Sequence, residues 1–215
     1  MQHLTLWACI GVTVVGLVGM IAAERLGRPS LLWLWKPLAS AGFVAAGMLS
    51  PTLAAWSSKW LVVGLCFAAL GDVLLIPRGK RAFLAGLVAF LVGHVCYAVA
   101  FGVMGVHPLA LGVAGAAVLV VAVFVCRWLM PHVEGPMRVP VLAYVTVISA
   151  MVALSASTFV QTRAWLPLLG AGLFYLSDLA VARERFVTRG FVNRAWGLPT
   201  YYGGQLVLAA SLWVG

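Results

Sequence analysis

The stretch Ala68-Ala69-Leu70-Gly71-Asp72-Val73-Leu74-Leu75-Ile76 closes a long apolar run and places one acidic residue inside it. Roughly several kcal/mol are needed to bury an ionised carboxylate in hydrocarbon, so a chain keeps one there for a reason. The pattern returns later as Phe174-Tyr175-Leu176-Ser177-Asp178-Leu179-Ala180. Of the five acidic residues, only Asp72 and Asp178 lie within apolar segments. The function of the chain must therefore account for two carboxyl groups in apolar surroundings.

The apolar run that ends at Ile76 belongs to a chain that is apolar throughout. Hydrophobic residues make up 64% of its 215 residues and charged residues 9%, which is typical of an integral membrane protein. Because backbone groups in lipid need internal partners, these runs must be helices. We predict an all-α, polytopic membrane protein, with one domain over residues 1–215 and a bundle of eight transmembrane helices. The predicted ranges are 4–23, 30–50, 60–76, 82–104, 108–128, 137–159, 164–181 and 198–214.

Lysine and arginine residues are concentrated in alternate connections between these helices. The first, third, fifth and seventh connections hold eleven: Arg25, Arg28, Arg78, Lys80, Arg81, Arg127, Arg138, Arg183, Arg185, Arg189 and Arg194. The other connections hold only two, Lys59 and Arg163. Basic loops stay in the cytoplasm, so we expect both termini on the outer face of the cell (inner) membrane. The net charge of +9 is interpreted as topology and lipid-headgroup contacts, and no nucleic-acid partner is predicted.

No metal site and no cofactor are predicted. The four cysteines (Cys9, Cys66, Cys96 and Cys126) lie singly in apolar segments and are interpreted as packing residues. His94 is the only histidine embedded in the predicted helices, which is too few for a three-histidine zinc site. The sequence also lacks the P-loop, GxSxG and HExxH motifs.

Polar side chains lie at similar depths in several predicted helices. Asp72 and Asp178 are each about one turn from the predicted cytoplasmic end of their helix. His94 lies deeper, near the midplane. The other candidates in the cytoplasmic half are Lys36, Tyr144, Ser177, Tyr201, Tyr202 and Gln205. This convergence predicts one polar pocket in the cytoplasmic half of the bundle.

Each of these residues also has a purely structural interpretation. The aspartates could pair with Arg78 or Arg183 and fasten helices together. Lys36 could extend to the lipid headgroups, and His94 could be a hydrogen-bonded core residue. The tyrosines and Gln205 could likewise hold helices together. A catalytic interpretation of the aspartates is favoured because carboxyl groups inside membranes usually mark substrate or proton sites. Two such groups can differ in protonation, so that one acts as general acid while the other stays anionic.

The order and spacing of a larger set of residues resemble the YhhN family of membrane proteins, which includes the lysoplasmalogenases. The resemblance extends from the second to the eighth predicted helix. The residues that carry it are Lys36-Pro37, Gly71-Asp72, Phe83, Gly86, Phe90, Gly93-His94, Tyr97, Tyr144, Gly170-Ala171, Phe174, Ser177-Asp178, Tyr201-Tyr202 and Gln205.

The resemblance implies an enzyme that hydrolyses the vinyl ether bond of lysoplasmalogens, giving a fatty aldehyde and glycerophosphoethanolamine or glycerophosphocholine. A vinyl ether is cleaved by protonation of its β-carbon, which suits a protonated and an anionic aspartate and requires no metal or redox cofactor. The expected partners are a lysophospholipid substrate and membrane lipids. Lys36 or the cytoplasmic arginines would meet the phosphate of the substrate. Another lyso-ether lipid stays open as the substrate, as does the oligomeric state.

Two other functions are compatible with the same residues. In a proton-coupled lipid or small-molecule transporter, the aspartates would carry protons and the site would be reached from both faces. In a structural or assembly protein, they would form inert ion pairs. The polar residues gather toward one face, which favours the enzyme.

Overall fold

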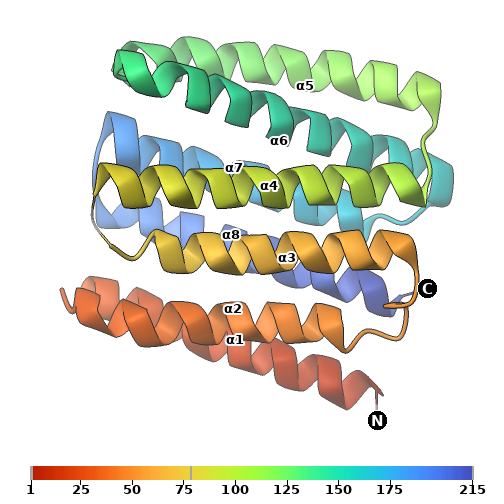
Figure 1. The fold of residues 1–215 in the computed structure, drawn as a ribbon, viewed down its shortest axis with the longest axis horizontal. Helices are drawn as coiled ribbons and strands as arrows, with labels where there is room; N and C mark the ends of the chain where they lie inside the picture. The colour runs from red at the N-terminus through yellow and green to blue at the C-terminus, as the bar shows by residue number, and fades with distance from the viewer. Residues whose placement is uncertain (1, 78, 215) are drawn as a thin grey trace.

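The computed structural model describes residues 2–77 and 79–214, and the secondary structure in these ranges is entirely helical (Figure 1). Arg78 lies outside the described residues. Short 3-10 helices occur at Pro29–Leu31, Met130–His132 and Ser211–Trp213, and a π-helix at Arg183–Val187. The α-helices are α1 (Gln2–Arg25), α2 (Leu32–Met48), α3 (Trp56–Leu74), α4 (Lys80–Met104), α5 (Pro108–Leu129), α6 (Gly135–Thr162), α7 (Leu166–Ala182) and α8 (Phe191–Ala210).

Prolines at the first turn mark the beginnings of three of these helices. Pro108, Pro136 and Pro167 stand at the first or second position of α5, α6 and α7. A helix has no internal partner for its first N–H groups, so a residue without an N–H loses nothing there. At α5 the His107 side chain also caps the helix, since its Nδ1 accepts a hydrogen bond from the Ala110 N–H at 3.3 Å.

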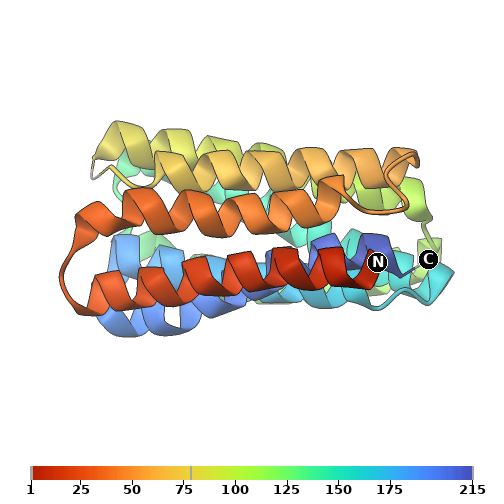
Figure 2. The same cartoon turned by 90° about the horizontal axis from the view of Figure 1, so that it is seen from below.

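The helices run side by side along the long axis of the molecule, and the two ends of the chain lie at the same end of the bundle (Figures 1 and 2). The most extensive pairings are between helices adjacent in sequence, α1 with α2, α3 with α4 and α7 with α8. α8 also contacts α1, α2 and α3, which places it between α7 and the pair of α1 and α2. α5 lies at the periphery and packs mainly on α6.

Seven helices in the described ranges are long and apolar enough to cross a membrane, so the chain is a multi-pass membrane protein. They comprise α1 to α7. α8 is not among them, and it begins at Phe191, not at the predicted residue 198. Its polar residues Asn193, Tyr201 and Gln205 are buried inside the bundle. The apolar-run criterion shortens this helix because its first turn carries Asn193 and Arg194, whose side chains pair with other elements.

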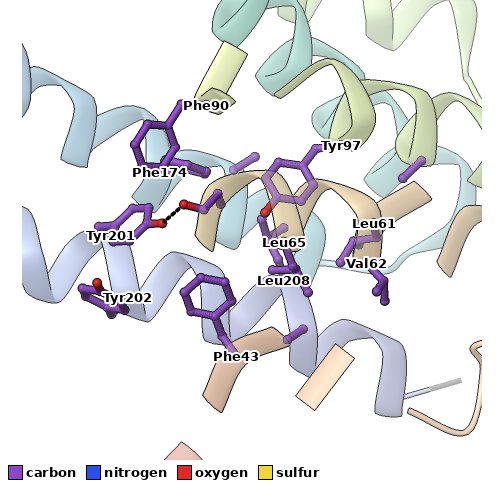
Figure 3. Packing of buried hydrophobic residues seen from close by; sticks show 14 of the residues in the cluster. Phe43, Leu61, Val62, Leu65, Phe90, Tyr97, Phe174, Tyr201, Tyr202 and Leu208 are labelled. Atoms are coloured by element: carbon purple, nitrogen blue, oxygen red, sulfur yellow. Dashed lines mark hydrogen bonds between the residues drawn. The ribbon is translucent and has the colours of Figure 1, made fainter. Parts of the chain in front are cut away.

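The close contact between α3 and α4 next to Asp72 depends on glycine residues of α3, which have no side chain. A Cβ added to Gly71 would lie 2.7 Å from the Phe90 ring. An added Cβ on Gly64 would similarly lie 2.4 Å from the Tyr97 ring. Glycine at these positions of α3 lets aromatic rings of α4 reach the centre of the bundle. Figure 3 shows the result, with Phe90 and Phe174 beside Tyr201 and with Phe43 beside Tyr202.

Candidate active site

A cavity of about 1200 Å³ lies at one end of the bundle. Glu24 at the end of α1, Lys80 at the beginning of α4 and Arg185 after α7 line its outer part, so it is reached from that end. This is the end opposite the two chain termini (Figure 1). The cavity is also lined by both apolar-segment carboxylates and most of the predicted site residues, namely Lys36, Asp72, Tyr144, Ser177, Asp178 and Tyr201.

The Asp72 carboxyl group is buried and surrounded by hydrogen-bond donors. The hydroxyl groups of Ser40 and Tyr201 donate to its Oδ2 at 2.7 and 2.9 Å. Lys36 Nζ lies 3.8 Å from Oδ1 and donates to the Asp72 backbone carbonyl at 3.3 Å. The side chain is 4% exposed. A carboxylate only accepts hydrogen bonds, so this arrangement suits an anion.

The Asp178 carboxyl group has fewer partners and is more open to the cavity, at 19% exposed. The Tyr144 hydroxyl donates to its Oδ2 at 2.9 Å. His94 Nε2 lies 3.6 Å from the same oxygen. The structure places no cation beside Asp178 among the described residues, so its surroundings differ in kind from those of Asp72.

Aromatic rings connect the two carboxyl groups. Tyr201, which holds Asp72, contacts the ring of Phe174 with centroids 5.3 Å apart. Phe174 in turn lies against His94 at 4.5 Å, beside Asp178. Phe90 closes the group by packing on both Phe174 and Tyr201. The surface between the carboxyl groups is therefore aromatic and can stabilise a positive charge through its ring faces.

The remaining predicted residues lie behind the cavity wall. His94 is fully buried and meets the site through Asp178 and the rings of Phe174 and Tyr144. Tyr202 packs against Phe43 and Tyr201, and Gln205 accepts a hydrogen bond from Tyr97 at 2.7 Å; neither lines the cavity. Ser177 lines it, but its hydroxyl donates to the Phe174 carbonyl of its own helix at 2.8 Å.

Ser40 is a site residue that the sequence interpretation missed. It follows Lys36 by four residues on α2, so both side chains face the same side of the helix and meet Asp72. That spacing could have revealed it. Phe90 and Phe174 are apolar residues in apolar helices, so their residue type alone did not distinguish them from packing residues.

The outer part of the cavity carries paired charges. Arg194, in the first turn of α8 and not in the connection before it, pairs with Glu24 of α1 and, at 3.1 Å, with Glu184 of the π-helix. Glu184 also accepts a hydrogen bond from Asn193 at 2.8 Å. Lys80 and Glu134 form a further, exposed pair at 3.1 Å. No group of three His, Cys, Asp or Glu residues in residues 2–77 and 79–214 could hold a metal ion.

Most of the chain matches a known family of proteins. The sequence model of the YhhN family matches residues 31–212. The chain belongs to the YhhN family. The match covers α2 to α8, as the sequence interpretation predicted, and it includes both aspartates and the residues that surround them.

Similar proteins of this family come from mammals and bacteria. The chain is 33% identical over 161 residues to "Lysoplasmalogenase TMEM86A" of Bos taurus, covering 72% of this chain and 65% of the bovine protein. It is 33% identical to the Homo sapiens protein of the same name, over 79% of this chain and 71% of that protein. It is 30% identical to "Lysoplasmalogenase" of Mycobacterium tuberculosis, over 94% of this chain and 78% of that protein. The matched region thus spans just under two thirds of the bovine protein. No solved structure matches the chain.

Proposed function

We propose that this YhhN-family protein is a membrane-embedded hydrolase that cleaves the vinyl ether bond of lysoplasmalogens. Its products are a fatty aldehyde and glycerophosphoethanolamine or glycerophosphocholine. The observation that carries the proposal is that two carboxyl groups with different surroundings line one cavity. The names of the mammalian and mycobacterial relatives, all lysoplasmalogenases, support the same activity.

The lining of the cavity matches an amphipathic substrate. Its apolar wall is contributed by α5, α6 and α7, and it can hold an alkenyl chain. This wall consists of Val125, Leu129, Val145, Ile148 and Leu179. The charged outer part can hold a headgroup, with Lys36 or an outer arginine at the phosphate. In this pose the vinyl ether, between chain and headgroup, lies near the two aspartates.

The proposed reaction uses the two carboxyl groups in turn. One, as the acid, transfers its proton to the β-carbon, and the alkene π electrons form the new C–H bond. The oxocarbenium ion that results is stabilised by the second carboxylate, which then accepts a proton from the attacking water. The hemiacetal collapses as the first carboxylate takes its hydroxyl proton and the second protonates the departing glycerol oxygen. Both groups return to their initial state.

We further propose one domain of eight membrane-spanning helices, with both termini outside and the cavity opening toward the cytoplasm across an inner membrane. The support is that the cavity lies at the end of the bundle rich in Lys and Arg. α8 makes the eighth pass, packed against α7, α1, α2 and α3. Cysteines placed beside Lys59 should react with an impermeant reagent from outside, and cysteines beside Arg81 should not. The reverse labelling would overturn the orientation.

The activity is tested with protein purified in dodecyl maltoside. Wild type should release fatty aldehyde from a lysoplasmalogen but not from the saturated ether analogue, which has no alkene carbon to protonate. An absence of aldehyde, with transport of protons or lipid across vesicles instead, would contradict the enzyme and favour the transporter.

A further inference from the structure

We infer that Asp178 is the general acid, that Asp72 is the anion, and that His94 is the positioning residue that keeps the proton on Asp178. This inference rests on the proposed function, which by itself leaves the two aspartates unassigned. It follows from which atoms around each carboxyl group can donate a hydrogen bond and which can only accept one.

Three donors fix the state of Asp72. Lys36 has no acceptor atom, and it lies at 3.8 Å from Oδ1. Ser40 and Tyr201 both direct their hydroxyl groups at Oδ2. A proton on this carboxyl group would oppose the neighbouring ammonium group and compete with two hydroxyl donors. Asp72 is therefore built to remain a carboxylate.

His94 presents the opposite kind of atom to Asp178. Its Nδ1 lies 2.6 Å from the Phe90 carbonyl oxygen, which can only accept, so Nδ1 carries the ring hydrogen. In the neutral ring the remaining nitrogen, Nε2, is then a lone-pair acceptor. Nε2 has no hydrogen-bond partner among the described residues and lies 3.6 Å from Asp178 Oδ2.

An acceptor beside a carboxyl group favours the protonated acid, because a carboxylate and a lone pair repel each other. The 3.6 Å separation is longer than a hydrogen bond, and we infer that it shortens when substrate fills the cavity. The Tyr144 hydroxyl on α6 donates to the same oxygen at 2.9 Å. His94 and Tyr144 thus both contact Oδ2, the carboxyl oxygen that carries the proton.

Protonation of one carboxyl group can be measured without turnover. The probe is the infrared C=O stretch of a protonated carboxyl group, recorded as wild-type minus variant difference spectra in dodecyl maltoside, which has no carbonyl group. At neutral pH wild type should show one such band, retained in Asp72→Asn and missing in Asp178→Asn. A band lost with Asp72→Asn, or no band in wild type, would overturn the assignment. Neither result depends on which lipid is cleaved, so failure of the assignment is distinct from failure of the proposed function.

Two further sets of variants keep the assignment testable if Asp178→Asn does not fold. Asp178→Glu should shift the band rather than remove it, and an unmoved band would contradict the inference.

The role of His94 is tested by two variants. His94→Phe keeps a ring against Phe174 but removes the acceptor, whereas His94→Gln keeps an acceptor. The band should move in His94→Phe and move less in His94→Gln. With lysoplasmalogen as substrate, kcat should fall about three- to tenfold in His94→Phe, recover partly in His94→Gln and leave KM nearly unchanged. A residue that only packs would leave the band unmoved, and this outcome would reject the role of His94.

Discussion

The two aspartates stand at similar places on α3 and α7, but their surroundings are nearly opposite. Asp72 is buried and is met by a lysine and two hydroxyl groups. Asp178 is more exposed to the cavity and is met by one tyrosine hydroxyl and an imidazole nitrogen. The same residue type is thus held in two electrostatic settings within one cavity. The difference shows how a pair of chemically equal side chains can serve as acid and base at one pH.

The largest effect should come from removing either carboxyl group. Asp72→Asn and Asp178→Asn should each lower turnover of a lysoplasmalogen by at least about 100-fold, because general acid and base groups typically contribute about 10²–10⁴-fold. The double variant should be little worse than either single one, since the effects of groups that act as a unit are not additive. Fatty aldehyde release measures this, with circular dichroism as the control for folding. Near-normal turnover in both single variants would reject the acid–base assignment.

Removal of the Lys36 ammonium group should affect Asp72 and not Asp178. Lys36→Met leaves that buried carboxylate without its charged partner, which in a fully buried pair costs roughly 3–5 kcal/mol and here less, because Lys36 is partly exposed. The unfolding temperature in detergent should fall, and adding Asp72→Asn should restore much of it. Lys59→Met, at a cation that lies over Trp56, is the matched control and should change little. If Asp72→Asn lowered the unfolding temperature of the Lys36→Met variant further, the proposed pairing of Lys36 with Asp72 would be wrong.

The tyrosines provide a finer comparison of the two sites. Tyr144→Phe removes the only hydrogen bond to the Asp178 carboxyl group from within the described residues. Tyr201→Phe leaves Asp72 with Ser40 and Lys36. A hydrogen bond between neutral groups, as between Tyr144 and a protonated Asp178, contributes about 0.5–1.5 kcal/mol. We therefore expect kcat to fall by about two- to tenfold in Tyr144→Phe. The fall should be smaller in Tyr201→Phe, because Asp72 keeps its other two partners. Equal losses of kcat in the two variants would contradict the proposed difference between the surroundings of Asp72 and Asp178.

The smallest effect should come from the outer charges. Arg194→Gln breaks the link between α1 and the π-helix, and KM for the lysolipid should rise a few-fold at nearly constant kcat, because partly exposed ion pairs contribute about 0.2–1 kcal/mol. Lys80→Gln removes a fully solvated pair and should alter neither constant. A large fall in kcat in Arg194→Gln would place chemistry in the outer part of the cavity.

Much of this architecture could be predicted from the sequence because lipid imposes a simple rule. The apolar runs located α1 to α7, and the cost of burying a carboxylate singled out Asp72 and Asp178. The same rule misplaced the beginning of α8, whose Asn193 and Arg194 face other helices and not lipid. A turn whose polar side chains pair with other elements need not be apolar in the way that lipid demands.

The finer structure of the site could not be predicted, because depth along a helix does not give the direction of a side chain. Gln205 lies one turn beyond Tyr201, yet it pairs with Tyr97 away from the cavity. His94, placed near the midplane by its position, turns toward Asp178 through its bond to the Phe90 carbonyl. Such orientations depend on how α4, α7 and α8 rotate against one another, which no single helix specifies.

The central claim is that a carboxyl proton is delivered to the β-carbon of a vinyl ether, and isotope incorporation tests it most directly. Wild-type protein should hydrolyse a lysoplasmalogen in D₂O enriched with ¹⁸O, and the aldehyde should be trapped as it forms. The account predicts one deuterium on the carbon next to the aldehyde and no ¹⁸O in the glycerophospho product, with unlabelled aldehyde incubated alongside as the exchange control. An aldehyde without deuterium, or ¹⁸O in the glycerol oxygen, would show that a different bond is broken and would contradict the account.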